Sequence, residues 1–321
     1  MLALDGDRVT LPRRARSDRP GTWALRWQDG WACSEGLAAL EDERVVRNVR
    51  AERGELRTGL RVQMDREVFA DPAARGASFR ETTFPTELGP APAWQVEGSG
   101  PDWAVMIHGR GADRREPLRA LRAFVARGMP ALVIAYRGDP EAPRIPDGLA
   151  RLGAAEWRDV DAAIAYALER GARRVVLVGF SLGGGMALSA ARWSRRRHAV
   201  AAVVLEAPFV DVGTTLRRAA SRRGFPPDLI PDAIREVEAV AGIDLTEIDH
   251  LRAAESLDVP ILLIHGDGDT AVPVASSDAL ARARPDLVTF HRVSGAGHLE
   301  AWNVDPRGYA AQIDAFLDRL S

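Results

Sequence analysis

The sequence contains no lysine, and all 43 of its basic residues are therefore arginine. This absence excludes a Schiff-base lysine and the phosphate-binding lysine of a Walker loop. The single cysteine, Cys33, excludes an intrachain disulfide, and we interpret it as a small hydrophobic residue without a chemical role. No apolar run approaches membrane-spanning length, and the N-terminus lacks the apolar segment of a signal peptide. These absences predict a cytoplasmic protein without membrane insertion.

The charges nearly cancel, because 45 acidic residues face 43 basic ones and the formal net charge is -2. A chain of this charge has no global basic field with which to hold nucleic acid, so we expect no nucleic-acid partner. With 321 residues, 46% of them hydrophobic, the chain can bury a full core. The composition therefore predicts a globular protein, and it leaves the oligomeric state open, with a homodimer among the options.

From about residue 95 onward, short apolar runs alternate with longer segments in which apolar residues recur every three to four positions. This alternation is typical of β-α-β units and predicts an α/β fold, with a mostly parallel central sheet and helices on both faces. The predicted strands are 103–107, 131–136, 174–180, 200–205, 261–265 and 288–293, and the predicted helices are 114–127, 154–170, 182–195, 274–284 and 306–320.

Residues 1–95 show a different pattern, with short alternating segments and frequent glycine and proline. They predict a β-rich N-terminal extension whose hairpins pack on the main sheet or extend it. Residues 96–321 form the predicted catalytic domain. Within it, the connection over about 209–256 is too long for a plain loop, and it predicts a cap insertion with one helix near 231–240.

The stretch Gly-Phe-Ser-Leu-Gly-Gly-Gly at 179–185 follows a predicted strand and opens a predicted helix. Neither a Walker loop nor a dinucleotide fingerprint fits its glycine spacing. Gly-x-Ser-x-Gly between a strand and a helix instead fits the nucleophile elbow, in which a strained turn exposes the serine hydroxyl at the edge of the sheet. The pattern therefore identifies Ser181 as a candidate nucleophile, although a simple packing turn has the same local sequence.

A serine hydroxyl needs a base, and the base needs an orienting carboxylate, in the chain order serine, acid, histidine. His298 follows the last predicted strand in a flexible Ser-Gly-Ala-Gly segment, which makes it the preferred base. Asp269 is the preferred acid because Asp267 lies nearer the strand end and is better placed to hold the loop. The less favoured alternatives are His108 and His265, which we expect to brace loops at strand ends, and the acids Glu206 and Asp211.

Four ordered motifs resemble the α/β-hydrolase superfamily of serine hydrolases: His108-Gly-Arg-Gly, Gly179-Phe-Ser-Leu-Gly-Gly, His265-Gly-Asp-Gly-Asp and Gly297-His298. Within it, the chain looks like the bacterial esterase and serine-aminopeptidase-like branch, in an uncharacterised actinobacterial-type group. The resemblance implies that Ser181, Asp269 and His298 form a catalytic triad. It also implies that the backbone N–H groups of Arg110 and Leu182 form an oxyanion hole, with no cofactor and no metal.

The predicted activity is hydrolysis of a small-molecule carboxylic ester through an acyl-enzyme. A thioesterase, a small-peptide aminopeptidase and a non-catalytic ligand-binding relative remain alternatives. Candidates for substrate binding are Arg110, Arg137, Phe209 and Phe225. Arginines near the first glycine motif would bind a carboxylate or phosphate of the substrate, unless Arg114 and Arg115 simply pair with neighbouring acids.

Overall fold

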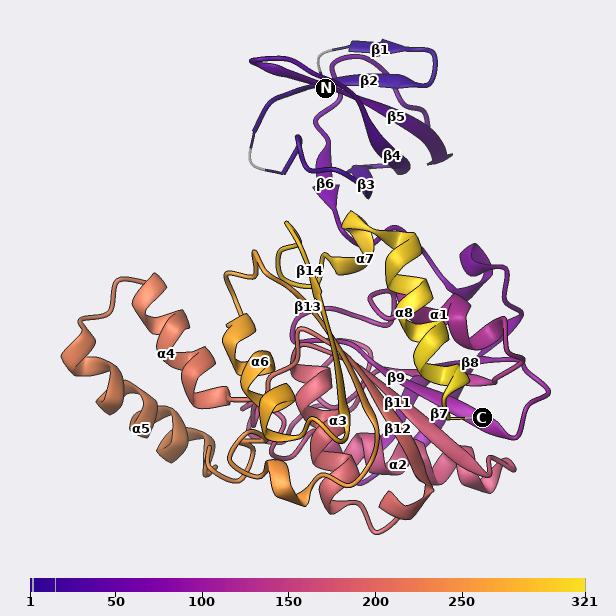
Figure 1. Cartoon of the computed structure of the whole chain (residues 1–321). Helices are drawn as coiled ribbons and strands as arrows, with labels where there is room; N and C mark the ends of the chain where they lie inside the picture. The colour runs from indigo at the N-terminus through magenta and orange to yellow at the C-terminus, as the bar shows by residue number, and fades with distance from the viewer. Residues whose placement is uncertain (2, 15, 321) are drawn as a thin grey trace.

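The computed structural model describes residues 1, 3–14 and 16–320, so three positions of the two predicted domains lie outside the described residues. A six-stranded antiparallel sheet comes first in the chain, at the top of Figure 1, with the order β1-β2-β5-β4-β3-β6. Its own small core includes Val9, Leu25 and Val49. The strands are β1 (Ala3–Asp5), β2 (Arg8–Pro12), β3 (Thr22–Trp27), β4 (Gly30–Leu40), β5 (Arg44–Arg53) and β6 (Gln63–Asp65).

The second sheet has eight strands in the order β14-β13-β12-β11-β9-β10-β8-β7. Its strands are parallel except for β8, which runs antiparallel to both of its neighbours. The six strands predicted from the sequence all form and lie in this sheet. The strands are β7 (Phe79–Thr86), β8 (Gly89–Val96), β9 (Asp102–Ile107), β10 (Ala131–Ile134), β11 (Arg174–Phe180), β12 (Val200–Glu206), β13 (Ile261–Gly266) and β14 (Val288–Val293).

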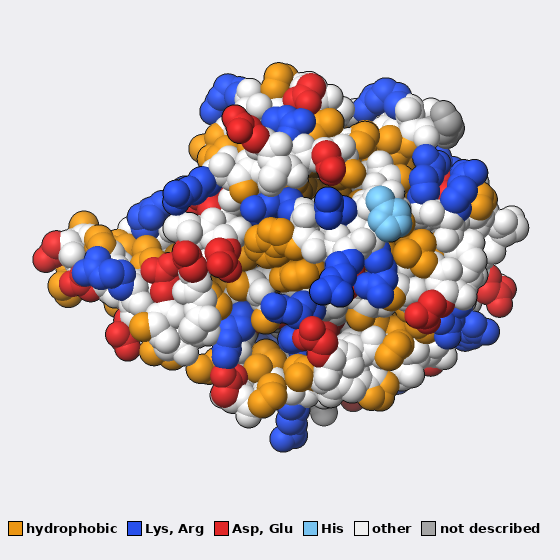
Figure 2. Space-filling model, turned by 90° about the horizontal axis from the view of Figure 1, so that it is seen from below, with side chains coloured by type: hydrophobic (Ala, Val, Ile, Leu, Met, Phe, Trp, Pro, Cys, Tyr) orange, Lys and Arg blue, Asp and Glu red, His pale blue; other side chains and the backbone are white. Residues whose placement is uncertain are grey.

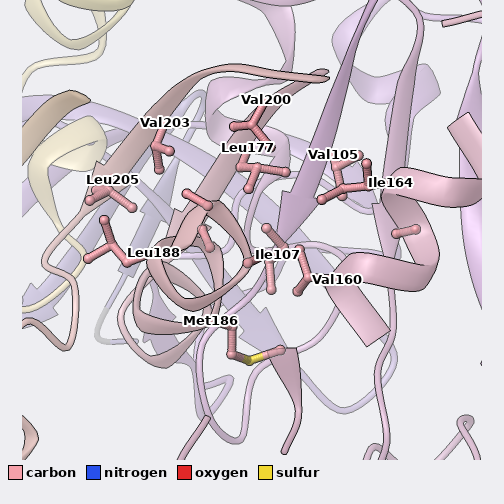
Figure 3. Packing of buried hydrophobic residues seen from close by; sticks show 14 of the residues in the cluster. Val105, Ile107, Val160, Ile164, Leu177, Met186, Leu188, Val200, Val203 and Leu205 are labelled. Atoms are coloured by element: carbon pink, nitrogen blue, oxygen red, sulfur yellow. The ribbon is translucent and has the colours of Figure 1, made fainter. Parts of the chain in front are cut away.

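Helices cover both faces of this central sheet. Successive side chains of a strand point to opposite faces, so Val105 and Ile107 join one core cluster while Ala104 and Met106 join the other. In Figure 3 the first cluster lies between the strands and the helices α2 (Trp157–Glu169) and α3 (Leu182–Trp193). The other α-helices of the sandwich are α1 (Leu118–Val125), α6 (Val274–Ala283), α7 (Ala301–Val304) and α8 (Pro306–Asp318).

The predicted cap insertion contains two α-helices, and the prediction of a single helix was incomplete. α4 (Val212–Arg222) and α5 (Ile230–Ala241) project from the main body at the left of Figure 1. α4 escaped the sequence pattern because it buries only Val212 and Thr215, although Asp211 gives it a side-chain cap on the backbone N–H of Thr214. Single-turn 3-10 helices are η1 (Pro72–Arg75), η2 (Arg197–Ala199), η3 (Pro227–Leu229) and η4 (Ala254–Ser256).

The boundary between the two parts of the chain differs from the prediction at residue 95. The first sheet ends at Asp65, and β7 and β8, which lie within the predicted extension, belong to the central sheet, as in the predicted alternative in which its hairpins extend that sheet. β8 pairs along its length with β10, with Val96 opposite Ala131. The alternating pattern of a hairpin predicts its strands correctly but does not reveal which sheet they join.

On the face drawn in Figure 2, arginine and acidic side chains are intermixed, with apolar side chains between them. This mixture agrees with the small net charge of the sequence. Across residues 1, 3–14 and 16–320, the helices are all too short or too polar to span a bilayer.

Candidate active site

Ser181 occupies the turn between β11 and α3, at the carboxyl end of a central strand. Its backbone has φ 52° and ψ -115°, in the left-handed half of conformational space that residues other than glycine rarely occupy. Two backbone hydrogen bonds hold this strained turn: Ser181 N–H donates to Glu206 O at 3.0 Å, and Phe209 N–H donates to Ser181 O at 3.0 Å. Strain of this kind persists only where the surroundings enforce it, as they do at a nucleophile elbow.

The glycines around Ser181 are required by close backbone contacts. A Cβ at Gly179 would lie 2.6 Å from Gly184 Cα, and one at Gly183 would lie 2.4 Å from the carbonyl oxygen of His108. A Cβ at Gly184 would lie 2.7 Å from Pro208 Cβ. The glycine run therefore lets the helix start press against both neighbouring strand ends, which fixes the position of the serine.

The structure brings together the three residues predicted as a triad. His298 Nε2 lies 3.0 Å from Ser181 Oγ, and His298 Nδ1 lies 2.7 Å from Asp269 Oδ2. Asp269 and Ser181 are buried, whereas the His298 side chain is 22% exposed. The arrangement allows the ring to accept the serine proton at Nε2 while the carboxylate holds the proton at Nδ1.

Four hydrogen bonds fix the Asp269 carboxylate. Its Oδ1 accepts from the backbone N–H groups of Ala271 and Val272 at 2.7 and 2.9 Å, and its Oδ2 faces His298 and also His265 Nε2 at 3.0 Å. Burial by itself would raise the pKa of Asp269, but hydrogen bonds from His265 and His298 outweigh it and hold the pKa well below its usual range. His265 thus braces this loop, as expected, by binding the acid directly.

The alternative acids have other structural roles. Asp267 accepts a hydrogen bond from Gly295 N–H at 2.8 Å and so ties its loop to the segment that leads to the histidine. Glu206 accepts from the backbone N–H of Ala301 at 3.1 Å. Asp211 caps α4. These contacts leave Asp269 as the carboxylate that binds the His298 ring.

The loop after β9 places Arg110 beside Ser181. A Cβ at Gly109 would lie 3.1 Å from Ser181 Cβ, so the loop approaches the elbow as closely as glycine allows. The Gly109 carbonyl oxygen accepts a hydrogen bond from the Tyr136 hydroxyl at 3.3 Å and lies 2.8 Å from His108 Nδ1. Because the C=O and N–H of a trans peptide point in opposite directions, this fixes the Arg110 N–H on the side away from Tyr136.

His108 faces hydrogen-bond acceptors with both ring nitrogens, since its Nε2 lies 2.9 Å from Asp139 Oδ2 and its Nδ1 faces the Gly109 carbonyl. Burial lowers its pKa, but the hydrogen bond to Asp139 outweighs this and the net direction is upward. The ring also stacks on Tyr136 with 4.5 Å between centroids. His108 therefore braces the loop, in agreement with the role predicted for it.

A fully buried glutamate connects this loop to the chain segment that leaves the first sheet. Glu116 accepts a hydrogen bond from Gly109 N–H at 2.7 Å, and its other carboxylate oxygen accepts from Arg66 at 3.0 Å. The Glu116 side chain has no exposed area, and Arg66 follows directly after β6. The N-terminal part of the chain is thus bonded to the loop that carries Arg110.

A second buried glutamate makes the same kind of connection on the histidine loop. Glu300 accepts a hydrogen bond from Gly297 N–H at 3.1 Å, next to His298, and forms an ion pair with Arg19, which lies between β2 and β3. Nearby, the Asn303 side chain donates to two backbone carbonyl oxygens of the N-terminal region. Both loops that flank Ser181 are therefore anchored by residues from the first 66.

A cavity of about 490 Å³ opens in front of Ser181 and His298. Phe209, predicted as a pocket wall, lines it, whereas Phe225 does not line it and is 47% exposed at the end of the cap helices. The prediction for Phe225 was therefore wrong, because the turn after α4 carries it outward. The other lining residues are Arg110, Thr215, Ala219, Arg222, Arg223, Thr270, Ala271 and Val272.

Arg137 is not free to bind a substrate. Its guanidinium pairs with the buried Asp159 and with Glu87 at 3.2 Å, and it lies outside the residues that line the cavity. Arg114 and Arg115 are likewise held by carboxylates, those of Glu81 and Glu141 and those of Asp113 and Glu67. The prediction of Arg137 as a substrate-binding residue was therefore wrong, whereas Arg114 and Arg115 pair with acids, the alternative that the sequence had left open.

Comparison with protein families shows to which family the chain belongs. Residues 120–321 match the model of the prolyl oligopeptidase family. The chain belongs to the prolyl oligopeptidase family. Residues 1–65 match a second model, described as a domain of unknown function (DUF8805). That match ends at Asp65, where the first sheet ends.

Solved structures share the fold of this prolyl oligopeptidase family member, and a curated relative is similar to it in sequence. An esterase of Pyrococcus furiosus is 17% identical with a TM-score of 0.64, and the match covers 78% of this chain and 94% of that one. An acylaminoacyl peptidase of Pyrococcus horikoshii is 18% identical with a TM-score of 0.59, covering 94% of this chain and 49% of that one. An uncharacterized protein of Mycobacterium tuberculosis strain H37Rv is 29% identical, covering 68% of this chain and 70% of the relative.

The prediction of an α/β-hydrolase fold is confirmed, and the family member is a serine hydrolase. Its match to the acylaminoacyl peptidase covers more of the chain than the catalytic domain alone and so extends into the N-terminal sheet. The match also covers only about half of that peptidase.

Proposed function

We propose that the protein hydrolyses a small-molecule carboxylic ester through an acyl-enzyme intermediate. The observation that carries the proposal is the continuous chain of contacts from Ser181 Oγ to His298 Nε2 at 3.0 Å and from His298 Nδ1 to Asp269 Oδ2 at 2.7 Å. In the first step Ser181 attacks the acyl carbon while His298 takes its proton. The imidazolium then gives that proton to the leaving alkoxide, and a water activated by the same ring releases the acid.

The proposed oxyanion hole consists of two backbone N–H groups on either side of the serine. Leu182 is the first residue of α3, so its N–H has no intrahelical carbonyl partner, and it lies next to the nucleophile. The N–H of Arg110 is oriented by the clamp on the Gly109 carbonyl. Preorganised donors of this kind typically contribute a factor of about 100 to 1,000 in turnover each.

An ester is the proposed substrate because the similarity to esterases spans nearly their whole length, whereas the similarity to the acylaminoacyl peptidase spans about half of that chain. The name of the family favours a peptide bond as the second candidate. A thioester would be attacked by the same groups. The cap of two helices leaves a cavity of about 490 Å³, which suits a small substrate under each of these options.

Two measurements test the proposal. A neutral fluorophosphonate should label the protein at Ser181, and Ser181→Ala should remove both the labelling and the turnover of p-nitrophenyl acetate. Rates on p-nitrophenyl esters, an aminoacyl p-nitroanilide and an acyl-CoA then rank the three leaving groups. If the protein fails to label, or labels equally after Ser181→Ala, the chain is a non-catalytic ligand-binding relative and the proposed function is wrong.

A further inference from the structure

The cavity in front of Ser181 carries positive charge on its walls. Three of its lining residues, Arg110, Arg222 and Arg223, are arginines, and none of the described residues that line it is an aspartate or a glutamate. Asp269 lies behind His298, and its oxygens are already occupied by four hydrogen bonds. The wall therefore presents guanidinium groups to a bound molecule without carboxylates beside them.

These three arginines also lack carboxylate partners among the described residues. In the part of the chain that the structure describes, Arg110, Arg222 and Arg223 take part in no ion pair. Arg222 donates to the carbonyl oxygen of Thr270, and Arg223 makes only a 3.4 Å contact with Ala219 O on its own helix. By contrast, the three arginines that the sequence analysis singled out beside Arg110, namely 114, 115 and 137, each bind two carboxylates.

The cap helix α4 delivers two of the three guanidinium groups along one of its faces. Thr215, Ala219, Arg222 and Arg223 line the cavity, and their spacing of three to four residues places them on the same side of a helix. The bond from Arg222 fixes this face against Thr270, the residue after the proposed catalytic acid. Arg110 lies on the opposite element, the loop after β9.

We propose that the substrate of this hydrolase carries an anionic group, a carboxylate or a phosphate, which is bound between α4 and the loop of Arg110. The inference rests on the proposed function, because it describes the substrate of the same site. A guanidinium binds either anion through two parallel N–H···O bonds, and hydrogen bonds to charged groups are about twice as strong as neutral ones. Arg110, Arg222 and Arg223 are exposed, so the attraction they exert is screened by salt.

A matched pair of esters tests the proposal on the full chain. Mono-p-nitrophenyl glutarate is anionic, and its methyl ester has the same chain and leaving group without the charge. We expect kcat/KM for the anionic ester to exceed that for the neutral ester by about tenfold or more, as two charge-assisted bonds allow. The preference should shrink as salt is added. Equal rates, or a faster neutral ester, would overturn the proposal.

Arg223→Gln is the sharper variant, since Arg222 also holds the Thr270 carbonyl and its loss would disturb both esters. We expect Arg223→Gln to reduce the anionic-to-neutral ratio of kcat/KM by about fivefold or more, chiefly through KM. Arg217→Gln is the matched control, because Arg217 lies on the same helix, binds Thr214 and does not line the cavity. If Arg217→Gln and Arg223→Gln change the ratio equally, long-range charge and not binding is responsible.

Fluorophosphonate labelling separates failure of this inference from failure of the proposed function. Protection of Ser181 from a neutral fluorophosphonate by glutarate, but not by glutaramide, supports an anionic subsite even if neither ester is turned over. Inorganic phosphate as a third protectant distinguishes a phosphate site from a carboxylate site. Labelling that glutarate and phosphate leave unchanged overturns the inference while the nucleophile remains established.

Discussion

Removal of the Arg66 side chain should destabilise the protein and slow its reaction, although Arg66 lies outside the central sheet. Arg66 binds the carboxylate of Glu116, whose other oxygen holds the Gly109 N–H of the loop that carries Arg110. In Arg66→Ala this carboxylate stays buried with one backbone donor at 2.7 Å and the Arg119 guanidinium at 3.9 Å. The folded state then contains a poorly paired buried charge, whereas in the unfolded state water solvates the same carboxylate.

The size of the effect follows from the exposure of the two partners. Breaking a buried ion pair by removal of one partner costs about 3–5 kcal/mol. The Glu116 side chain is fully buried, but that of Arg66 is 28% exposed, and Arg119 remains nearby. We therefore expect a loss of about 2–3 kcal/mol in the free energy of unfolding, at or just below the lower end of that range. The loosened Gly109 peptide should lower kcat more than it raises KM.

Urea unfolding and p-nitrophenyl acetate turnover, measured on Arg66→Ala beside Arg13→Ala, test this expectation. Arg13 also pairs with an acid in the N-terminal region, but its side chain is 41% exposed and that of its partner Asp18 is 34% exposed. Such a surface pair contributes about 0–1 kcal/mol. The two variants remove the same side chain, so the difference between them measures the burial of the carboxylate partner.

A double-mutant cycle with Glu116→Gln provides the refuting result. If the buried charge causes the loss, Arg66→Ala should cost less when Glu116 is already neutral, and the two effects should fail to add by about 1 kcal/mol or more. Additive effects, or an Arg66→Ala variant as stable as Arg13→Ala, would refute the reasoning. In that case Arg66 would be a surface residue that does not stabilise the loop carrying Arg110.

Three further outcomes are expected. Asp269→Asn should lower kcat on p-nitrophenyl acetate by about 10⁴-fold with the fold retained by circular dichroism, because an amide cannot hold the histidine tautomer; a loss below tenfold would contradict the assigned role. Burial, and then the charge of Arg192, lowers the pKa of His250 to about 3 in the folded state, against about 6.5 in the unfolded chain. The unfolded state therefore binds a proton first as the pH drops from about 6.5 towards 3, and the free energy of unfolding should fall over this range, by about 2 kcal/mol at pH 5. Urea unfolding at pH 7 and pH 5 should show a smaller difference for His250→Asn, and an unchanged difference would argue against it. Gly183→Ala should cost about 2 kcal/mol or more in thermal unfolding, since its Cβ would lie 2.4 Å from a backbone oxygen. Gly213→Ala serves as the control, because a Cβ there would meet the flexible Arg217 side chain at 3.4 Å and Asp211 Oδ1 at an ordinary 3.6 Å.

The central sheet could be predicted because its strands are local signals. Apolar runs such as 174–180 and 261–265 are buried on both faces, and the pattern of a doubly covered strand requires no knowledge of its neighbours. The assignment of the β7–β8 hairpin to this sheet could not be predicted, because pairing with β10 depends on contacts between distant residues. α4 was missed because its segment, Val212–Arg222, consists mostly of arginine and small or polar residues and contains few large apolar side chains.

The residues proposed to do the chemistry could be predicted, whereas those that hold them could not. Ser181 and His298 stand in short motifs whose spacing reflects the local turn, so they are visible in the sequence. Glu116 and Glu300 are buried acids that act through arginines 50 and 281 positions away, and no local pattern marks them. Arg223 could not be predicted for the same reason, since the sequence alone does not show which arginines have no carboxylate partner in the folded protein.

The contacts of Asn303 have a consequence for the order in which the protein is made. Its side chain donates to Thr22 O at 2.8 Å and to Arg66 O at 2.9 Å, across 281 and 237 positions of sequence. The N-terminal sheet is complete once residue 65 has been translated, whereas Asn303 lies 237 positions after Arg66 and is translated much later. A nascent sheet must therefore wait for this part of its docking surface, and a chain truncated before residue 298 lacks both Asn303 and His298.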